Sequence, residues 1–212
     1  MPNKKVERRS YNFEIRADVD EQHGSIITGR PVVYNSRTDL GWFDEVIEPG
    51  ALNQTDLTDV RFLVNHDTKM IPLARSRRNN GNSTMRMTPD AQGLNLDYVS
   101  LDTENNATAK ALYSAVQRED LSGMSFMFTI DGERWENLES DHPTRYITKI
   151  GSIFEVSAVT WPAYENTEID ARSKEALDSA RSALDKARQQ REQSLDSDLE
   201  LEKAKLRLKG GH

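Results

Sequence analysis

The chain of 212 residues contains no cysteine. Disulfide bonds, thiolate zinc sites and a cysteine nucleophile are therefore excluded together. The chain also has no run of about 18 apolar residues, the length that a membrane-spanning helix needs. Its first residues are mostly polar and basic, and they lack the apolar segment of a secretory signal. These absences predict an intracellular protein that does not cross a membrane.

Large side chains are absent from the last part of the chain. Tyr164 is the last aromatic residue, and after it there is no Val and a single Ile, Ile169. The charge changes as well, because residues 1–170 hold 18 basic and 27 acidic side chains, whereas residues 171–212 hold 10 and 8. A segment without large side chains cannot close a core alone. We therefore expect a folded domain over residues 1–170 and an appendage over residues 171–212.

Proline and glycine are absent from residues 173–209, which are rich in strong helix formers such as Ala, Leu, Glu and Lys. This composition predicts one long helix or two shorter ones, with Ser173 as the N-cap and Gly210 at the end. Small and apolar residues recur there at helical spacing, namely Ala176, Leu177, Ala180, Ala183, Leu184 and Ala187. Such a stripe favours a helix that binds a partner or a second copy of the chain, and the alternative is a solvated tail.

Short β-prone segments fill most of residues 1–170. Tyr11, Phe13 and Ile15 alternate with polar residues, as on a half-buried strand. Pro31 lies inside a second candidate strand, residues 25–34, and predicts an edge or a bulge there. One helix is predicted over residues 105–118, and further strands over residues 42–47, 60–64, 85–87, 94–101, 125–130 and 146–160. The pattern predicts an α+β fold around a β-barrel or sandwich.

Two residues stand in contexts that suit nucleophilic catalysis. His66 follows the apolar segment 60–64, and a histidine at the end of a buried strand can project into a cleft. Ser125 lies between the predicted helix and an apolar strand, where its Oγ atom can face a site together with a backbone N–H donor. The alternatives are a histidine bonded to a loop and a serine that caps a turn. Ser122, in the same turn, is an alternative candidate for the nucleophile.

A histidine base needs an orienting group on its second ring nitrogen. The sequence offers Asp67, His142, Glu155 and Asp170. Glu155 interrupts an apolar, β-prone segment. A carboxylate there lies either on the solvent face of a strand or buried with a partner, because unpaired burial is costly.

Other chemistries fit the sequence less well. It has no Gly-x-Gly-x-x-Gly fingerprint, no phosphate-binding Gly-Lys-Ser/Thr loop and no histidine pair at metal-binding spacing. The absence of Gly-x-Ser-x-Gly weakens an esterase interpretation. The net charge of −7 gives no general attraction to nucleic acid, and the basic cluster at residues 75–78 lacks neighbouring aromatic residues. We therefore expect no cofactor, no metal and no nucleic-acid partner.

Four segments, in this order, resemble the tailed-bacteriophage prohead proteases, the capsid maturation proteases that look like relatives of the herpesvirus assemblins. The segments are Gly29-Arg-Pro-Val-Val-Tyr-Asn, Val64-Asn-His-Asp, Leu121-Ser-Gly-Met-Ser-Phe-Met-Phe and Phe154-Glu-Val-Ser-Ala-Val-Thr-Trp-Pro-Ala-Tyr. The resemblance implies a serine endopeptidase on an assemblin-like β-barrel surrounded by helices, with a long C-terminal helical tail. It implies no cofactor.

The resemblance also implies roles for individual residues. His66 would be the general base, Ser125 the nucleophile and Glu155 the orienting acid. Assemblins use a second histidine in the third position, which keeps His142 as an alternative. They also commonly use an arginine near the oxyanion, for which Arg75 is the candidate. Many relatives have a small residue where this chain has Met127.

The implied substrates are the scaffold segment of the major capsid protein precursor and the protease itself. Cleavage would take place inside the immature capsid, the prohead, in the host cytoplasm. The helix over residues 173–209 would target the protease to the scaffold or associate with a second copy, and it is a candidate for self-cleavage. The alternative is a non-catalytic head-assembly or scaffolding protein with the same β domain and helical tail.

Overall fold

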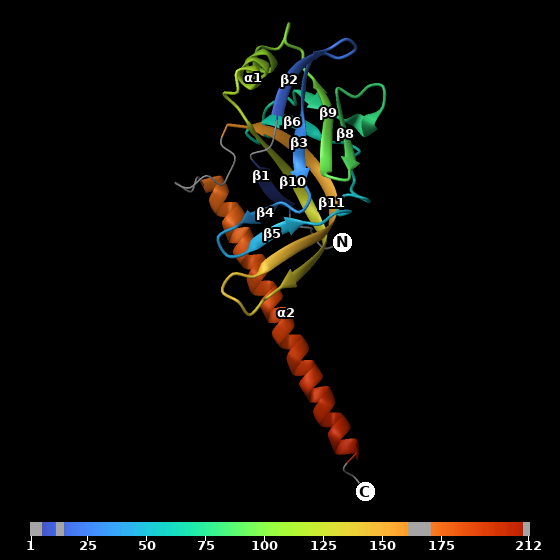
Figure 1. Ribbon diagram of the computed structural model, residues 1–212, viewed down its shortest axis with the longest axis vertical. Helices are drawn as coiled ribbons and strands as arrows, with labels where there is room; N and C mark the ends of the chain where they lie inside the picture. The colour runs from blue at the N-terminus through green and yellow to red at the C-terminus, as the bar shows by residue number, and fades with distance from the viewer. Residues whose placement is uncertain (1–5, 12–14, 161–170, 210–212) are drawn as a thin grey trace.

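The structure, a computed structural model, describes residues 6–11, 15–160 and 171–209. Most of the elements in these residues are β-strands. Figure 1 shows the strands gathered in one body, with the second helix running along it and extending beyond it. The elements are β1 (Val6–Tyr11), β2 (Ile15–Asp20), β3 (Gly24–Val33), β4 (Arg37–Asp39), β5 (Asp44–Ile47), β6 (Arg61–Val64), β7 (Ala74–Arg75), β8 (Met85–Asp90), β9 (Gly93–Ser100), α1 (Ala107–Gln117), β10 (Gly123–Glu136), β11 (Thr144–Val159) and α2 (Ala171–Lys209), with a 3₁₀ turn at Arg77–Asn79.

The long strands β10 and β11 form the centre of a seven-stranded sheet. They pair antiparallel, and β1 pairs antiparallel with the other edge of β10. The second edge of β11 is shared, because β5 pairs with its beginning and β6 with its end, both in parallel. β4 extends the sheet beyond β5, and β7 extends it beyond β6. The end of β6 therefore lies beside the end of β11, close to the beginning of β10.

A four-stranded antiparallel sheet, in the order β2-β3-β9-β8, packs against the first sheet. The strands predicted over residues 85–87 and 94–101 are present as β8 and β9, which form a hairpin, and the Asp90 carboxylate accepts bonds from the N–H groups of Gln92 and Gly93 in its turn. Gly93 has a φ of 147°, and a Cβ atom there would lie 2.0 Å from the carbonyl oxygen of Val32. Glycine is therefore required where this turn approaches β3.

The main core lies between the two sheets. Apolar side chains of β3, β8 and β9 meet those of β6, β10 and β11. Along β10, the buried side chains of Met124, Phe126 and Phe128 alternate with Ser125 and Met127, as a two-residue strand period requires. The opposite face of β10 is thus free to carry polar residues, and Ser125 lies on it.

Pro31 lies at a bulge, as predicted. In the pairing of β3 with β9, Gly29 is opposite Leu96 and Val32 is opposite Leu94, so β3 contains one extra residue there. The predicted strand through residues 11–15 is instead two strands, because β1 ends at Tyr11 and β2 begins at Ile15 in the other sheet. Phe13 lies outside the described residues.

Both predicted helices are present, but α2 begins at Ala171, so Ser173 lies inside it and the prediction of Ser173 as its N-cap is wrong. Asn106 caps α1 by accepting bonds from the backbone N–H groups of Thr108 and Ala109. α2 is one continuous helix, and its buried residues Ala180 and Leu184 pack against Leu40 and Phe43 near β4 and β5. The predicted stripe is therefore covered, in this part, by the protein's own β domain. Among the other stripe residues, Ala187 is buried and Ala183 half-buried, whereas the side chains of Ala176 and Leu177 lie outside the description.

The seven-stranded sheet brings β1 and β5 close enough for a side-chain contact between them. β1 and β5 are separated by β10 and β11, which in a flat sheet would place them about 14 Å apart. Yet the guanidinium group of Arg9 in β1 lies 2.5 Å from the carboxylate of Glu45 in β5. The predicted α+β class is confirmed. Among the described strands the pairing does not close into a barrel, so the assemblin-like barrel stays a prediction.

Candidate active site

Three polar residues share one face of the seven-stranded sheet. In the register of β10 and β11, Ser125 is opposite Ser157 and Met127 is opposite Glu155. Because side chains alternate between the faces of a strand, Ser125, Ser157 and Glu155 point to the same side. Both Glu155 and Ser157 are buried. The sequence allowed Glu155 to be either solvent-facing or buried with a partner, and in the structure it is buried.

His66 reaches this face from the turn that follows β6. Asn65 and His66 both have left-handed backbone conformations, with φ angles of 50° and 57°, which turn the chain sharply back over the sheet. The Asn65 N–H donates to the carbonyl oxygen of Ala158 at 2.9 Å, and its side-chain oxygen accepts two bonds from Thr160. The turn is thereby attached to the end of β11, and the imidazole is held beside that strand.

The His66 ring links the serine to the carboxylate. Its Nε2 atom lies 2.5 Å from Oγ of Ser125, and its Nδ1 atom lies 2.7 Å from Oε2 of Glu155. A carboxylate at Nδ1 favours the tautomer with the proton on Nδ1, which leaves Nε2 as an acceptor for the serine proton. The side chains of His66 and Glu155 are 7% and 4% exposed, so water does not compete for this contact.

Ser157 supports both members of the histidine–carboxylate pair. Its Oγ atom donates to Oε1 of Glu155 and accepts a bond of 3.1 Å from the backbone N–H of His66. Glu155 therefore uses one oxygen for the imidazole and the other for Ser157. Nothing in the sequence indicated Ser157, because its position depends on the pairing of β10, β11 and β6.

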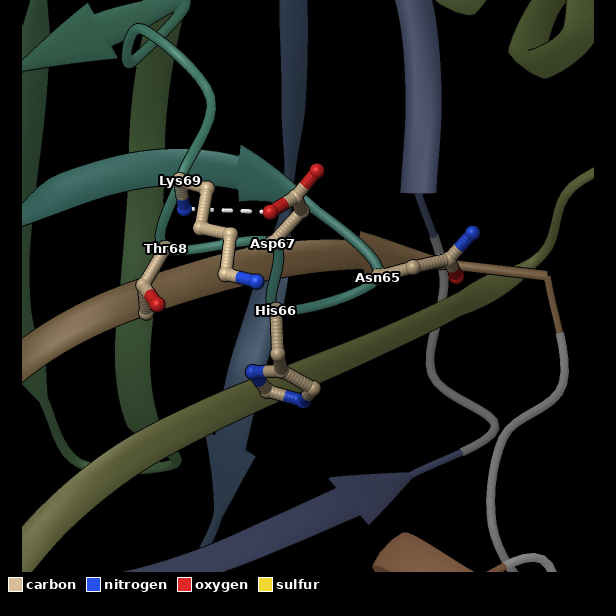
Figure 2. Close-up of a pocket in the computed structure, with 5 residues that line it drawn as sticks. All are labelled: Asn65, His66, Asp67, Thr68 and Lys69. Carbon is tan, nitrogen blue, oxygen red and sulfur yellow. Dashed lines mark hydrogen bonds between the residues drawn. The ribbon is translucent and has the colours of Figure 1, made fainter.

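The loop after His66 forms a surface pocket lined by residues 65–69. Figure 2 shows the His66 imidazole and the Asp67 carboxylate pointing to opposite sides of this loop. The Asp67 carboxylate instead accepts a bond of 3.0 Å from the backbone N–H of Lys69. Asp67 is thus a turn residue here, and Glu155 is the candidate that lies against the ring.

The other candidates lie elsewhere. His142 is exposed, and its Nε2 atom lies 3.2 Å from Oδ1 of Asp44. It precedes the start of β11, whereas Glu155 lies near the end of that strand. Arg75 forms two hydrogen bonds with the carboxylate of Asp59, which direct its guanidinium group to that residue. Ser122 is exposed. Asp170 lies outside the described residues.

A possible set of metal ligands surrounds His142. Ligand atoms of Asp39, Asp44 and His142 lie within 4.8 Å of one another. Burial raises the pKa of Asp44, but hydrogen bonds from Arg37 and His142 outweigh it and hold the pKa below its usual value. Arg37 and His142 are thus hydrogen-bond partners of Asp44 and account for the grouping of these side chains on the surface.

Strand β1 covers the serine. Ser125 is 0% exposed, and its Oγ atom lies 2.7 Å from the carbonyl oxygen of Arg9 as well as 2.5 Å from His66. Within the part of the chain that the structure describes, the single hydroxyl proton therefore faces both the imidazole and the β1 backbone as acceptors. Ser125 can donate fully to His66 only when its bond to β1 is given up.

The side chain of Arg9 is held on the other face of β1 by acidic groups. It forms two hydrogen bonds with Glu45, at 2.5 and 2.8 Å, and a third of 3.3 Å with Glu7. Arg145 lies 3.3 Å from the same Glu45 carboxylate. Burial alone would raise the pKa of Glu45, but the two guanidinium groups outweigh it and keep the pKa below the usual value.

A serine, an imidazole and a buried carboxylate in continuous contact have the geometry that serine hydrolases use. The comparisons are consistent with this class of protein. A family model described as caudovirus prohead serine protease matches residues 11–181. The chain therefore belongs to this family, which supports a protease role in the maturation of phage capsids. The match contains Ser125, His66 and Glu155 but begins at the end of β1.

Searches of curated proteins and of solved structures gave no significant match. The family assignment therefore rests on the family model alone. Within the described residues, no helix is both long and apolar enough to span a membrane.

Proposed function

We propose that the chain is a serine endopeptidase in which Ser125 is the nucleophile, His66 the general base and Glu155 the orienting acid. The observation that carries this proposal is the unbroken series of contacts from Ser125 Oγ through the imidazole to Glu155. Ser157 adds support, because it fixes the second oxygen of Glu155 and the backbone of His66. Together these contacts favour the tautomer that a base at Ser125 requires.

The reaction follows from these positions. Neutral His66 takes the Ser125 proton on Nε2 while Oγ forms a bond to the carbonyl carbon of a peptide. Glu155 stabilises the imidazolium that results and keeps the ring in place. The C–N bond then breaks, and His66 gives its proton to the leaving amine. Water attacks the ester on Ser125 by the same route, and releases the new carboxyl end and the free serine.

The proposed substrates are the scaffold segment of the major capsid protein precursor and the protease itself. The family, whose members act in phage capsid maturation, supports this choice. The proposed place of action is the prohead in the host cytoplasm. Packaging there raises the effective concentration of enzyme and substrate, so that a weak association is enough for cleavage.

We further propose residues 1–170 as the protease domain, with an assemblin-like barrel, and residues 171–212 as a helical tail. The contact of Arg9 with Glu45 supports the barrel. The tail has two parts, because residues 179–187 carry its buried contacts while the large apolar residues further along are exposed: Leu195, Leu199, Leu201 and Leu206. The exposed part suits the binding of helical scaffold or of a second copy of the chain.

Co-expression with the capsid precursor tests the proposed function. The wild-type chain should shorten the precursor or itself, as read by intact mass, and Ser125→Ala should leave both masses unchanged. Ser122→Ala is the matched control, because this serine lies in the preceding turn and is exposed. Unchanged masses with the wild type, together with normal particle assembly, would favour the non-catalytic assembly protein instead.

A further inference from the structure

Strand β1 lies where an extended substrate would have to lie. It pairs with β10 residue by residue, from Val6 opposite Thr129 to Tyr11 opposite Met124, and Ser10 is opposite Ser125. Proteins often bind an extended peptide by adding it to the edge of a sheet in this way. Ser125 has no exposed surface and its Oγ atom bonds to β1, so a peptide that took the place of β1 beside β10 would lie against the serine.

One peptide bond of β1 is presented to the nucleophile. The carbonyl oxygen of Arg9 lies 2.7 Å from Oγ of Ser125, and the peptide bond from this carbonyl leads to Ser10. Since a carbonyl carbon is about 1.23 Å from its oxygen, the carbonyl carbon of Arg9 lies within about 4 Å of Oγ. Arg9 is thus a β1 residue whose carbonyl group contacts the nucleophile.

The side chain of Arg9 fills a pocket that recognises a positive charge. It is 2% exposed, forms two hydrogen bonds with Glu45, and lies 5.7 Å from the centre of the Phe128 ring. Paired hydrogen bonds of this kind match a guanidinium group to a carboxylate. Glu45 belongs to β5 and Phe128 to β10, so both remain when β1 leaves.

We propose that β1 occupies the substrate path of this site and that substrates are cleaved after an arginine or lysine, whose side chain enters the pocket at Glu45. This inference rests on the proposed function. When β1 leaves, Glu45 keeps the partner Arg145 at 3.3 Å but loses the two hydrogen bonds from Arg9. A basic substrate side chain restores them, whereas an uncharged one leaves a buried carboxylate short of a partner.

The first experiment measures which bonds the full-length wild-type chain cleaves. A library of peptides from a denatured proteome is incubated with the chain, and the new ends are read by mass spectrometry. The expected result is that Arg and Lys predominate at the position before the cleaved bond. Cleavage without this preference would overturn the inference and leave the proposed function standing. Absence of any cleavage and of any labelling of Ser125 by a fluorophosphonate, in the wild type and in the Arg9→Ala variant alike, would refute the proposed function itself.

A pair of charge-removing variants locates the preference. Glu45→Gln should lower the ratio of kcat/KM for a peptide with arginine before the cleaved bond to kcat/KM for the same peptide with glutamine there by about 10- to 100-fold, because any loosening of β1 affects both peptides alike. Glu133→Gln is the matched control, because Glu133 also pairs with Arg145 but lies outside the contacts of Arg9. An equal loss for both peptides would contradict the pocket. If Glu45→Gln fails to fold, the residue that the wild-type chain prefers before the cleaved bond still tests the inference.

A second pair of variants tests whether β1 occupies the path. Arg9→Ala removes the anchor in the pocket, and Ser125 should then react with a fluorophosphonate about 10-fold faster or more, since charged hydrogen bonds are lost. Arg8→Ala is the control, because its neighbouring guanidinium points to Met127 rather than to Glu45. A peptide of residues 4–14 should slow the labelling of Arg9→Ala again, and the same peptide with alanine at position 9 should not. Equal labelling rates for Arg9→Ala and Arg8→Ala would overturn the occupancy by β1.

Discussion

The Oγ atom of Ser125 lies 2.5 Å from Nε2 of His66, although 59 positions separate the two residues in the sequence. The contact exists because β6 and β10 lie on either side of β11, and the turn after β6 crosses β11 toward β10. Glu155 and Ser157 come from the strand between them. Ser125, Glu155 and Ser157 therefore lie on strands that are paired along both edges, and such rigid elements hold a site more precisely than loops do.

Removal of the base tests the role of His66. His66→Ala should reduce peptide cleavage by about 10⁴-fold or more, because Ser125 then has no acceptor for its proton. The rate of cleavage of the capsid precursor is the measurement. His142→Ala should retain activity, since this exposed histidine pairs with Asp44. Activity that depends on His142 and survives the loss of His66 would reverse the assignment.

Substitution of the carboxylate tests the third position. Glu155→Gln keeps the shape of the side chain but removes the charge that stabilises the imidazolium. The rate should fall by about 10²–10⁴-fold, less than in Ser125→Ala. Single-turnover cleavage measures the effect without a contribution from product release. Full activity would mean that another group orients His66.

Ser157 is a positioning residue, because it acts through Glu155 and His66. Ser157→Ala should lower kcat by about 10-fold with little change in KM, as expected when one supporting hydrogen bond is lost. Ser157→Thr keeps the hydroxyl group and should recover part of the rate. A purely structural role would lower the melting temperature of Ser157→Ala without this difference in kcat between alanine and threonine.

The buried Glu45 makes stability depend on pH. Because the pKa of Glu45 in the folded protein lies below the usual value of 4.5, its contribution is present above about that pH and is lost on acidification. The difference in unfolding free energy between wild type and Glu45→Gln should therefore be largest near neutral pH and shrink below about pH 4. Urea unfolding at several pH values measures it. A difference that is constant across this range would contradict the paired, ionised Glu45.

Leu184 fixes α2 to the β domain. Leu184→Ala leaves a cavity beside Leu40 and Phe43 and should reduce stability by about 2–5 kcal/mol. Leu199→Ala removes the same atoms from an exposed position of the same helix and should change the free energy of unfolding by less than about 0.5 kcal/mol. Hydrogen exchange in α2, together with thermal unfolding, distinguishes the two. Equal effects would mean that α2 is not docked through Leu184.

Part of this structure could be predicted from the sequence. The strand before His66, the helix capped by Asn106 and the β8–β9 hairpin follow from local patterns of apolar, capping and turn residues. Ser125 and His66 could be singled out because each stands at the end of an element. Glu155 could be noticed because it is a charge inside an apolar segment.

The remaining features depend on strand pairing between distant segments, which local patterns do not encode. Ser157 becomes a partner of Glu155 and His66 only through the register of β6, β10 and β11. The covering of Ser125 by β1 depends on a pairing across more than half of the chain. Arg75 has the residue type of an oxyanion group, but Asp59 lies close enough to bind its guanidinium.

The central claim is that Ser125 is a nucleophile activated by His66. The most direct measurement is peptide mapping by mass spectrometry after the wild-type chain has reacted to saturation with a fluorophosphonate. The account predicts one adduct, on Ser125, and no adduct at this position in the His66→Ala variant. An adduct on Ser122 or another serine, or labelling of Ser125 that is as fast without His66, would contradict it.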